Sequence, residues 1–136
     1  MHVVVVTKNT PDTEAAVTVN PNGMVSWGDK LVVNPWDEYA ITEAVLLKGA
    51  HNGKATILTV GPQEHEESLK HGLAIGIDQA FRVWDASMEG YDSLTYAKAV
   101  AAAVKKLGDV DLVIFGKEFS DIASDQHIYQ VARLLG

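Results

Sequence analysis

Residues 34–37, Asn-Pro-Trp-Asp, combine the chemistry of a helix start with an aromatic side chain that a helix start does not need. Asn34 is a good N-cap and Pro35 suits the first helical position. Asp37 lies where a carboxylate favours the positive end of a helix, which leaves Trp36 without a role. The free N–H groups of a helix N-terminus also bind anions, so two interpretations are open: a well-formed helix start alone, or a helix start that faces a ligand.

The sequence lacks the common catalytic and nucleotide-binding patterns. It contains no G-x-G-x-x-G, no G-x-x-x-x-G-K-[ST] and no G-x-S-x-G. His65 precedes Glu66, but no histidine follows at the spacing of H-E-x-x-H, so this type of zinc chemistry is excluded. We expect no metal site and no catalytic residues. The histidines interpreted as solvated or capping residues are His2, His51, His65 and His71.

Composition indicates an ordinary globular chain. Its 136 residues are 47% hydrophobic and 21% charged, which favours a single domain over 1–136. The net charge of −7 comes without a basic cluster, so we expect no nucleic acid as partner. The absence of cysteine is compatible with a reducing cytoplasm. The first apolar run is too short to span a membrane, and we interpret Met1 as the true start of a cytoplasmic chain that is not an integral membrane protein.

Short apolar runs alternate with helical patterns along the chain. The runs are typical of buried parallel strands and cover residues 2–7, 55–60, 80–84 and 111–116. Helical patterns cover residues 36–48, 63–75 and 92–107. Residues 14–33 contain "NPNG" between two apolar stretches, which predicts an inserted β-hairpin. The order predicts an α/β fold: a doubly wound, mainly parallel sheet with helices on both faces.

Ligands of such folds bind beyond the carboxyl ends of the strands. Four loops lie there, at residues 7–13, 61–63, 85–93 and 116–126, and each mixes glycine or proline with small hydroxyls and single charges. Any one of them is explained by turn chemistry alone. Together on one edge they favour close backbone approach to a phosphate or ribose over acid–base chemistry.

Several stretches closely resemble the amino-terminal half of the electron transfer flavoprotein beta subunit. They are "VVVVTKNTPDTEAAV" (3–17), "VVNPWDEYAITEAVLLK" (32–48), "TILTVGPQEHEESLKHGLAIGIDQA" (56–80), "YDSL" (91–94) and "DLVIFGKEFSDIASDQHIYQVARLLG" (111–136). The resemblance implies a Rossmann-like fold and a heterodimer with an alpha subunit that holds most of an FAD. It also implies an electron carrier, not an enzyme, between acyl-CoA or other dehydrogenases and a quinone oxidoreductase or another acceptor.

By the same resemblance, this chain would bind AMP, or a second FAD if it belongs to the electron-bifurcating members. Residues 34–37 would then both start a helix and contact the nucleotide. The site residues carried over by position are Val6, Lys8, Asn34, Pro35, Trp36, Asp37, Val60, Gly61, Gly116, Lys117, Phe119, Ser120, Asp121, Ser124, Asp125, Gln126 and His127.

The sequence departs from the family in two places. The family pattern Asp-x-Asp-Thr-x-Gln-x-Gly is changed over residues 121–128, where Asp125 would oppose a phosphate and Ile128 replaces a glycine. The chain also stops where the family continues, so we expect a truncated subunit that exposes an apolar face and self-associates. Two alternatives stay open: a stand-alone adenine-nucleotide module of the universal-stress type, and an interaction domain that has lost its ligand.

Overall fold

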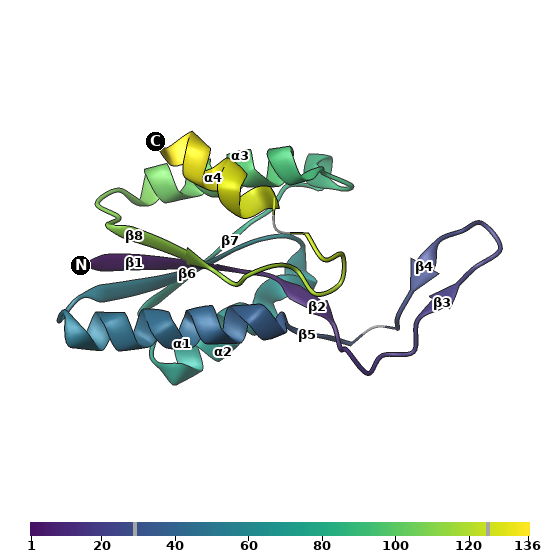
Figure 1. Cartoon of the computed structure of the whole chain (residues 1–136), viewed down its shortest axis with the longest axis horizontal. Coiled ribbons are helices and arrows are strands. Elements are labelled where there is room, and N and C mark those ends of the chain that lie inside the picture. Colours follow the sequence, from purple (N-terminus) through teal and green to yellow (C-terminus); the bar gives the residue numbers. More distant parts are fainter. Residues whose placement is uncertain (29, 125) are drawn as a thin grey trace.

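The computed structural model describes residues 1–28, 30–124 and 126–136. Its centre is a four-stranded sheet in the order β7-β6-β1-β8, and all three neighbouring pairs are parallel. The strands are β1 (His2–Thr7), β6 (Lys54–Val60), β7 (Gln79–Val83) and β8 (Leu112–Phe115). The predicted parallel runs are therefore confirmed, and each boundary lies within one residue of its expected position (Figure 1).

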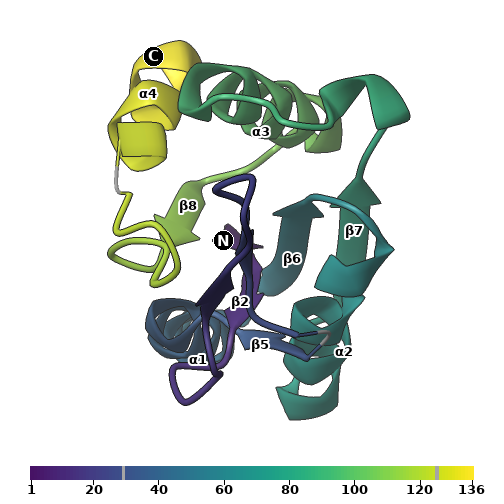
Figure 2. The same cartoon turned by 90° about the vertical axis from the view of Figure 1, so that its right-hand side faces the viewer.

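The two central strands, β1 and β6, are buried on both faces because most of their side chains are apolar. Val4 and Val6 of β1 pack in one hydrophobic cluster with Val100 of the third helix. Val3 and Val5 point the other way and pack in a second cluster with the first two helices. Figure 2 shows the two layers of helices, α3 and α4 on one side of the sheet and α1 and α2 on the other. The predicted doubly wound, Rossmann-like α/β fold is confirmed.

The helices begin where capping and turn chemistry allow. They are α1 (Pro35–Ala50), α2 (Glu66–Ile75), α3 (Ser93–Leu107) and α4 (Gln126–Leu135). Two short 3₁₀ turns, η1 (Gln63–His65) and η2 (Ala86–Met88), precede α2 and α3. The predicted helix at 63–75 is thus divided between η1 and α2. Asp92 caps α3, since its Oδ1 accepts a hydrogen bond of 2.7 Å from the Thr95 N–H.

The predicted hairpin exists and is longer than expected. Near the body, β2 (Asn9–Pro11) pairs antiparallel with β5 (Leu31–Val33). Further out, β3 (Thr18–Val19) pairs antiparallel with β4 (Val25–Ser26). We call residues 14–28 the arm. Figure 1 shows that it extends away from the body, beyond the ends of the parallel strands.

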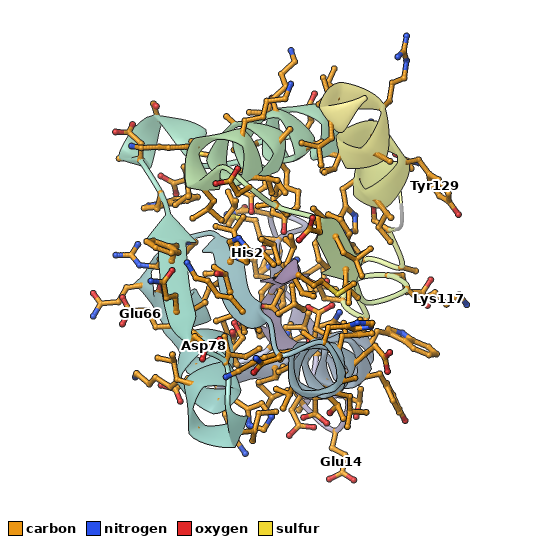
Figure 3. The ribbon with its side chains drawn as sticks, turned by 90° about the vertical axis from the view of Figure 1, so that its left-hand side faces the viewer. His2, Glu14, Glu66, Asp78, Lys117 and Tyr129 are labelled. Atoms are coloured by element: carbon orange, nitrogen blue, oxygen red, sulfur yellow. The ribbon has the colours of Figure 1, made fainter. Side chains whose placement is uncertain are left out.

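The opposite edge of the sheet, where the strands begin, is closed by contacts between neighbouring elements (Figure 3). The His2 ring lies 2.8 Å from the Thr56 hydroxyl, and the His2 N–H donates to Asp111. Asp78 accepts a hydrogen bond from the Ala55 N–H at 2.9 Å. These side chains connect neighbouring elements of the fold. A ligand site is therefore expected at the other edge, where the parallel strands have their carboxyl ends.

Candidate functional site

The strand order places a topological switch point between β1 and β8. The chain proceeds from β1 to β6 and β7 on one side, and then returns to β8 on the other side of β1. Ligands of open α/β sheets bind outside the carboxyl ends of the strands at such a point. Lys8 follows β1 there, and residues 116–124 follow β8. Two of the four predicted loops therefore meet at the position that the fold itself favours (Figure 2).

Lys8 joins both sides of this switch point. Its backbone N–H donates to Asp37 Oδ2 at 2.8 Å, and its carbonyl accepts from the Asn34 N–H at 3.0 Å. Its Nζ forms an ion pair of 2.7 Å with Asp121 Oδ2 and lies 4.7 Å from the centre of the Phe119 ring. The Lys8 backbone is thus fixed to the start of α1, while its ammonium group is held by the loop after β8.

Asn34 occupies the N-cap position of α1, but its side chain makes no capping hydrogen bond. Its Nδ2 donates to the Glu118 carbonyl at 2.8 Å, and its Oδ1 accepts from the Ser120 N–H at 3.2 Å. The residue is fully buried. The predicted N-cap position is therefore confirmed, but the side-chain amide fixes the loop after β8 against the helix start and does not cap α1.

Asp37 is a buried carboxylate at the centre of this junction, 2% exposed. Burial raises its pKa to about 7, although hydrogen bonds from Lys8, Asn34 and Gly116 act in the opposite direction. Gly116 has no space for a side chain, since a Cβ would overlap the Asp37 carboxylate and the backbone of Trp36. Glycine at 116 is required by this close approach.

A pocket of about 260 Å³ opens at the switch point, on the side of α3 and α4. Four of its lining residues carry aromatic rings. Phe119 and His127 are stacked with centroids 4.0 Å apart, and Tyr96 meets both rings edge-on at 5.6 and 5.5 Å. Tyr91 stacks on Tyr96 at 5.7 Å. The lining residues are Lys8, Gly90, Tyr91, Asp92, Ser93, Tyr96, Phe119, Ile122, Ser124 and His127.

The predicted site residues fall into three groups. Those that line the pocket are Lys8, Phe119, Ser124 and His127. Those that support it from behind are Asn34, Asp37, Gly116, Ser120 and Asp121. The remaining predicted residues lie elsewhere. Val6 and Val60 belong to the core, Gly61 lies against His65, and Pro35 is in the first turn of α1. The side chains of Trp36, Lys117 and Gln126 are exposed. Asp125 lies outside the described residues.

Trp36 therefore points outward in this structure. Its side chain is 38% exposed, and the Lys117 ammonium lies 5.3 Å from the centre of its ring. Such an exposed cation–π contact is worth about 0.5–1 kcal/mol. Ile128, the residue that replaces the family's glycine, lies half-buried in the first turn of α4. Contact of residues 34–37 with a nucleotide stays a prediction.

One wall of the pocket is formed by Tyr91, Asp92, Ser93 and Tyr96. The first three lie in the predicted ligand-facing loop 85–93 but were not among the predicted site residues, and Tyr96 lies outside every predicted loop. A signal was present: Tyr96 stands four residues before Val100 and eight before Val104, so it lies on the buried face of a helix that follows a strand. His65, predicted to be a solvated or capping residue, is the N-cap residue of α2 but is not solvated. It is buried, and this burial lowers its pKa to about 4.

Fold and pocket together define a Rossmann-like α/β protein with its ligand-sized cavity at the switch point. Residues 23–136 match the family model described as the electron transfer flavoprotein domain. The chain belongs to the electron transfer flavoprotein family, and its resemblance to a beta-type chain is confirmed by curated relatives.

Three of these relatives show the extent of the match. The protein FixA of Azorhizobium caulinodans is 36% identical over 142 residues, covering 100% of this chain and 50% of its own. The electron transfer flavoprotein subunit beta of Clostridium acetobutylicum is 33% identical, with 100% and 52% covered. That of Bacillus subtilis is 33% identical, with 99% and 52% covered. The chain spans about half the length of the curated relatives it matches.

Within residues 1–28, 30–124 and 126–136, no group of three or more histidine, aspartate or glutamate side chains is placed to hold a metal ion. In the same part of the chain, no helix has the length and apolar character needed to cross a membrane.

Proposed function

We propose that this chain acts in the cytoplasm as the beta subunit of an electron transfer flavoprotein and binds AMP in the pocket at the switch point. The observation that carries the nucleotide site is the pocket itself, since it lies between β1 and β8 and is lined by Lys8 and by the loop after β8. In this role the chain binds and positions a nucleotide and a partner subunit. It carries no catalytic residue.

The pocket suits the base and sugar of a nucleotide better than its phosphate. Its aromatic walls offer faces and edges for a flat ring. Lys8 is the cation among its lining residues, and Asp121 already neutralises it at 2.7 Å. A volume of about 260 Å³ is below the range of roughly 300–1,000 Å³ that is typical of sites for drug-sized ligands. These features favour AMP over a complete second FAD.

The proposed partner is an alpha subunit that holds most of the FAD, and bound FAD would supply the electron-carrying chemistry. The surface of the arm supports the proposal that a partner subunit docks there. Residues 15–28 contain no charged side chain, yet residues 16–28 are all exposed. This part of the arm therefore lacks charged side chains and exposes methionine and tryptophan, and this composition is typical of the core of a protein–protein interface. Electron exchange with acyl-CoA or other dehydrogenases and with a quinone oxidoreductase completes the proposed role.

Two measurements test this function. Isothermal titration calorimetry of the chain with AMP and with FAD should show AMP binding. Co-expression with an alpha-type subunit should yield a yellow complex that contains both chains, whereas this chain alone should be colourless. Failure to bind AMP at millimolar concentration overturns the nucleotide site, and failure to assemble with any alpha-type subunit overturns the electron-carrier role.

One observation favours a second function, an interaction domain without a ligand. The Lys8–Asp121 ion pair and the Phe119–His127 stack already satisfy the groups that a nucleotide would use. Under this alternative the chain assembles with its partner subunit but binds neither AMP nor FAD. The same pair of measurements separates the two functions.

A further inference from the structure

We propose that the Tyr96 hydroxyl forms the hydrogen bond that anchors a flat nitrogen heterocycle, the base of the nucleotide, in the switch-point pocket. This inference rests on the proposed nucleotide site and adds a binding residue that the family resemblance did not supply. Tyr96 lies on α3, and its ring packs edge-on against Phe119 of the loop after β8.

The first observation is an unsatisfied buried hydroxyl. Tyr96 is 2% exposed, and its hydroxyl has no hydrogen-bond partner among the described protein groups. A buried polar group without a partner is unfavourable, and buried tyrosines usually have one. Phenylalanine would fill the same space without this disadvantage, so the hydroxyl calls for a function.

The second observation is its location. The Tyr96 ring contacts Tyr91, Phe119 and His127, and all three line the pocket together with Tyr96. The hydroxyl therefore belongs to a side chain in the pocket wall, surrounded by the faces and edges of other rings. A flat heterocycle that enters this space brings ring nitrogens or an exocyclic group to the hydroxyl, which donates and accepts hydrogen bonds.

Three other polar side chains of the lining are already engaged. The Tyr91 hydroxyl donates to the Val60 carbonyl at 3.3 Å. Asp92 caps α3 through Thr95, and the Lys8 ammonium is paired with Asp121. Against this background, Tyr96 offers a buried hydrogen-bonding group that a ligand can use without breaking a protein contact.

The test replaces only the hydroxyl, with Tyr96→Phe. We expect affinity for AMP and for adenosine to fall by the same factor, about fivefold to tenfold, as for the loss of one buried hydrogen bond. Binding of ribose 5-phosphate, which has no base, should not change. The melting temperature of the ligand-free variant should rise by a few degrees, because the unsatisfied hydroxyl is gone. A merely structural tyrosine would not weaken binding and raise Tm together.

Two matched variants are the controls. Tyr129→Phe changes an exposed residue of α4 that does not line the pocket, so its Tm and its AMP affinity should both stay unchanged. Tyr39→Phe changes an exposed residue of α1 and should alter neither quantity. If the unmodified chain binds AMP and Tyr96→Phe binds it equally well, this inference alone is wrong. If the unmodified chain binds neither AMP nor adenosine, both the inference and the proposed nucleotide site are wrong.

Discussion

The switch point and the arm use their side chains in opposite ways. At the switch point, three segments far apart in sequence are fixed by buried polar contacts, with Asn34 bonded to the loop after β8 and Asp37 to Lys8. In the arm, Val19 and Met24 are 67% and 66% exposed, and the strands of the arm pair only with each other. Buried polar contacts thus join the three segments of the switch point, while apolar residues of the arm stay exposed.

This difference separates the residues that maintain the fold from those that can meet a ligand or a partner. Asn34 and Asp37 were predicted from the family resemblance to contact a nucleotide, yet here their polar atoms are used within the protein. The side chains left to contact a ligand are those of the pocket wall. Replacements at the junction should therefore change stability strongly, and replacements in the arm should change it little.

The largest expected effect is on the pH dependence of stability. Asp37 has a raised pKa of about 7, so the folded state keeps a proton that the unfolded state releases above about pH 4. Its contribution therefore falls as pH rises from about 4 to 7. His65 has a lowered pKa of about 4, so its contribution rises from about pH 4 to 6.5. Each slope is at most about 1.4 kcal/mol per pH unit, and the two oppose each other.

Urea unfolding between pH 4.5 and 7.5 tests this opposition. The parent chain should show a shallow profile. His65→Gln should leave the Asp37 slope, with stability falling toward pH 7, whereas Asp37→Asn should leave the His65 slope, with stability rising. Parallel profiles for both variants would mean that neither group titrates with the perturbed pKa.

Gly116→Ala should be strongly destabilising. Its Cβ would overlap the Asp37 carboxylate and the backbone at the start of α1, so the junction must move. Overpacking of this kind costs about 1–3 kcal/mol. Gly49→Ala is the matched control, since a Cβ there meets no atom within 4 Å inside α1, and it should stabilise by up to about 1 kcal/mol. Equal free energies of unfolding for the two variants would contradict the close approach at Gly116.

Asp121→Asn should improve nucleotide binding. It releases the Lys8 ammonium from its ion pair and removes a negative charge beside the pocket. We expect AMP affinity to rise about fivefold, equivalent to roughly 1 kcal/mol, while adenosine affinity stays the same. Titration calorimetry at low salt measures both, since screening weakens the effect.

Asp12→Asn provides the control for this charge change. Asp12 pairs loosely with Lys30 at 4.0 Å near the base of the arm and does not line the pocket. It should leave AMP affinity unchanged. A similar gain from both variants would show that the effect comes from net charge and not from release of Lys8.

The fold was predictable because its signals are local. The apolar runs of β1 and β6 end at turn-forming residues, which fixed their boundaries to within one residue. The hairpin followed from Asn20 and Gly23, and in the structure the Asn20 side chain accepts two backbone hydrogen bonds in that turn. The strand order was not predictable in this way, because it depends on packing between elements.

The site was predictable only in part, because its contacts are remote in sequence. Asn34 looks like an N-cap in any local window, yet its partner Ser120 lies 86 residues away. Tyr96 follows the apolar periodicity of α3 and so looks like a core residue. Its free hydroxyl becomes evident only when Phe119 and His127, from the other end of the chain, are placed against it.

The smallest expected change in stability comes from replacements in the arm, because its side chains at 16–28 are exposed and those of the body's core are buried. Val19 and Val25 face each other across β3 and β4 and are both exposed, so replacing both by threonine keeps a strand-forming shape and removes apolar surface. The free energy of unfolding should change by less than about 0.5 kcal/mol. By contrast, Val5→Thr introduces a hydroxyl into the core and should cost about 1–3 kcal/mol.

Assembly with an alpha-type subunit tests whether the arm binds a partner, independently of its small contribution to the free energy of unfolding. If the arm docks onto an alpha-type subunit, the double variant Val19→Thr, Val25→Thr should weaken that complex while its own unfolding is unchanged, because a partner would lose two apolar contacts at a charge-free surface. Size-exclusion chromatography of the co-expressed pair, with the flavin absorbance followed, measures this. A loss of stability above 1 kcal/mol in the isolated double variant would show instead that the arm packs against its own chain in solution.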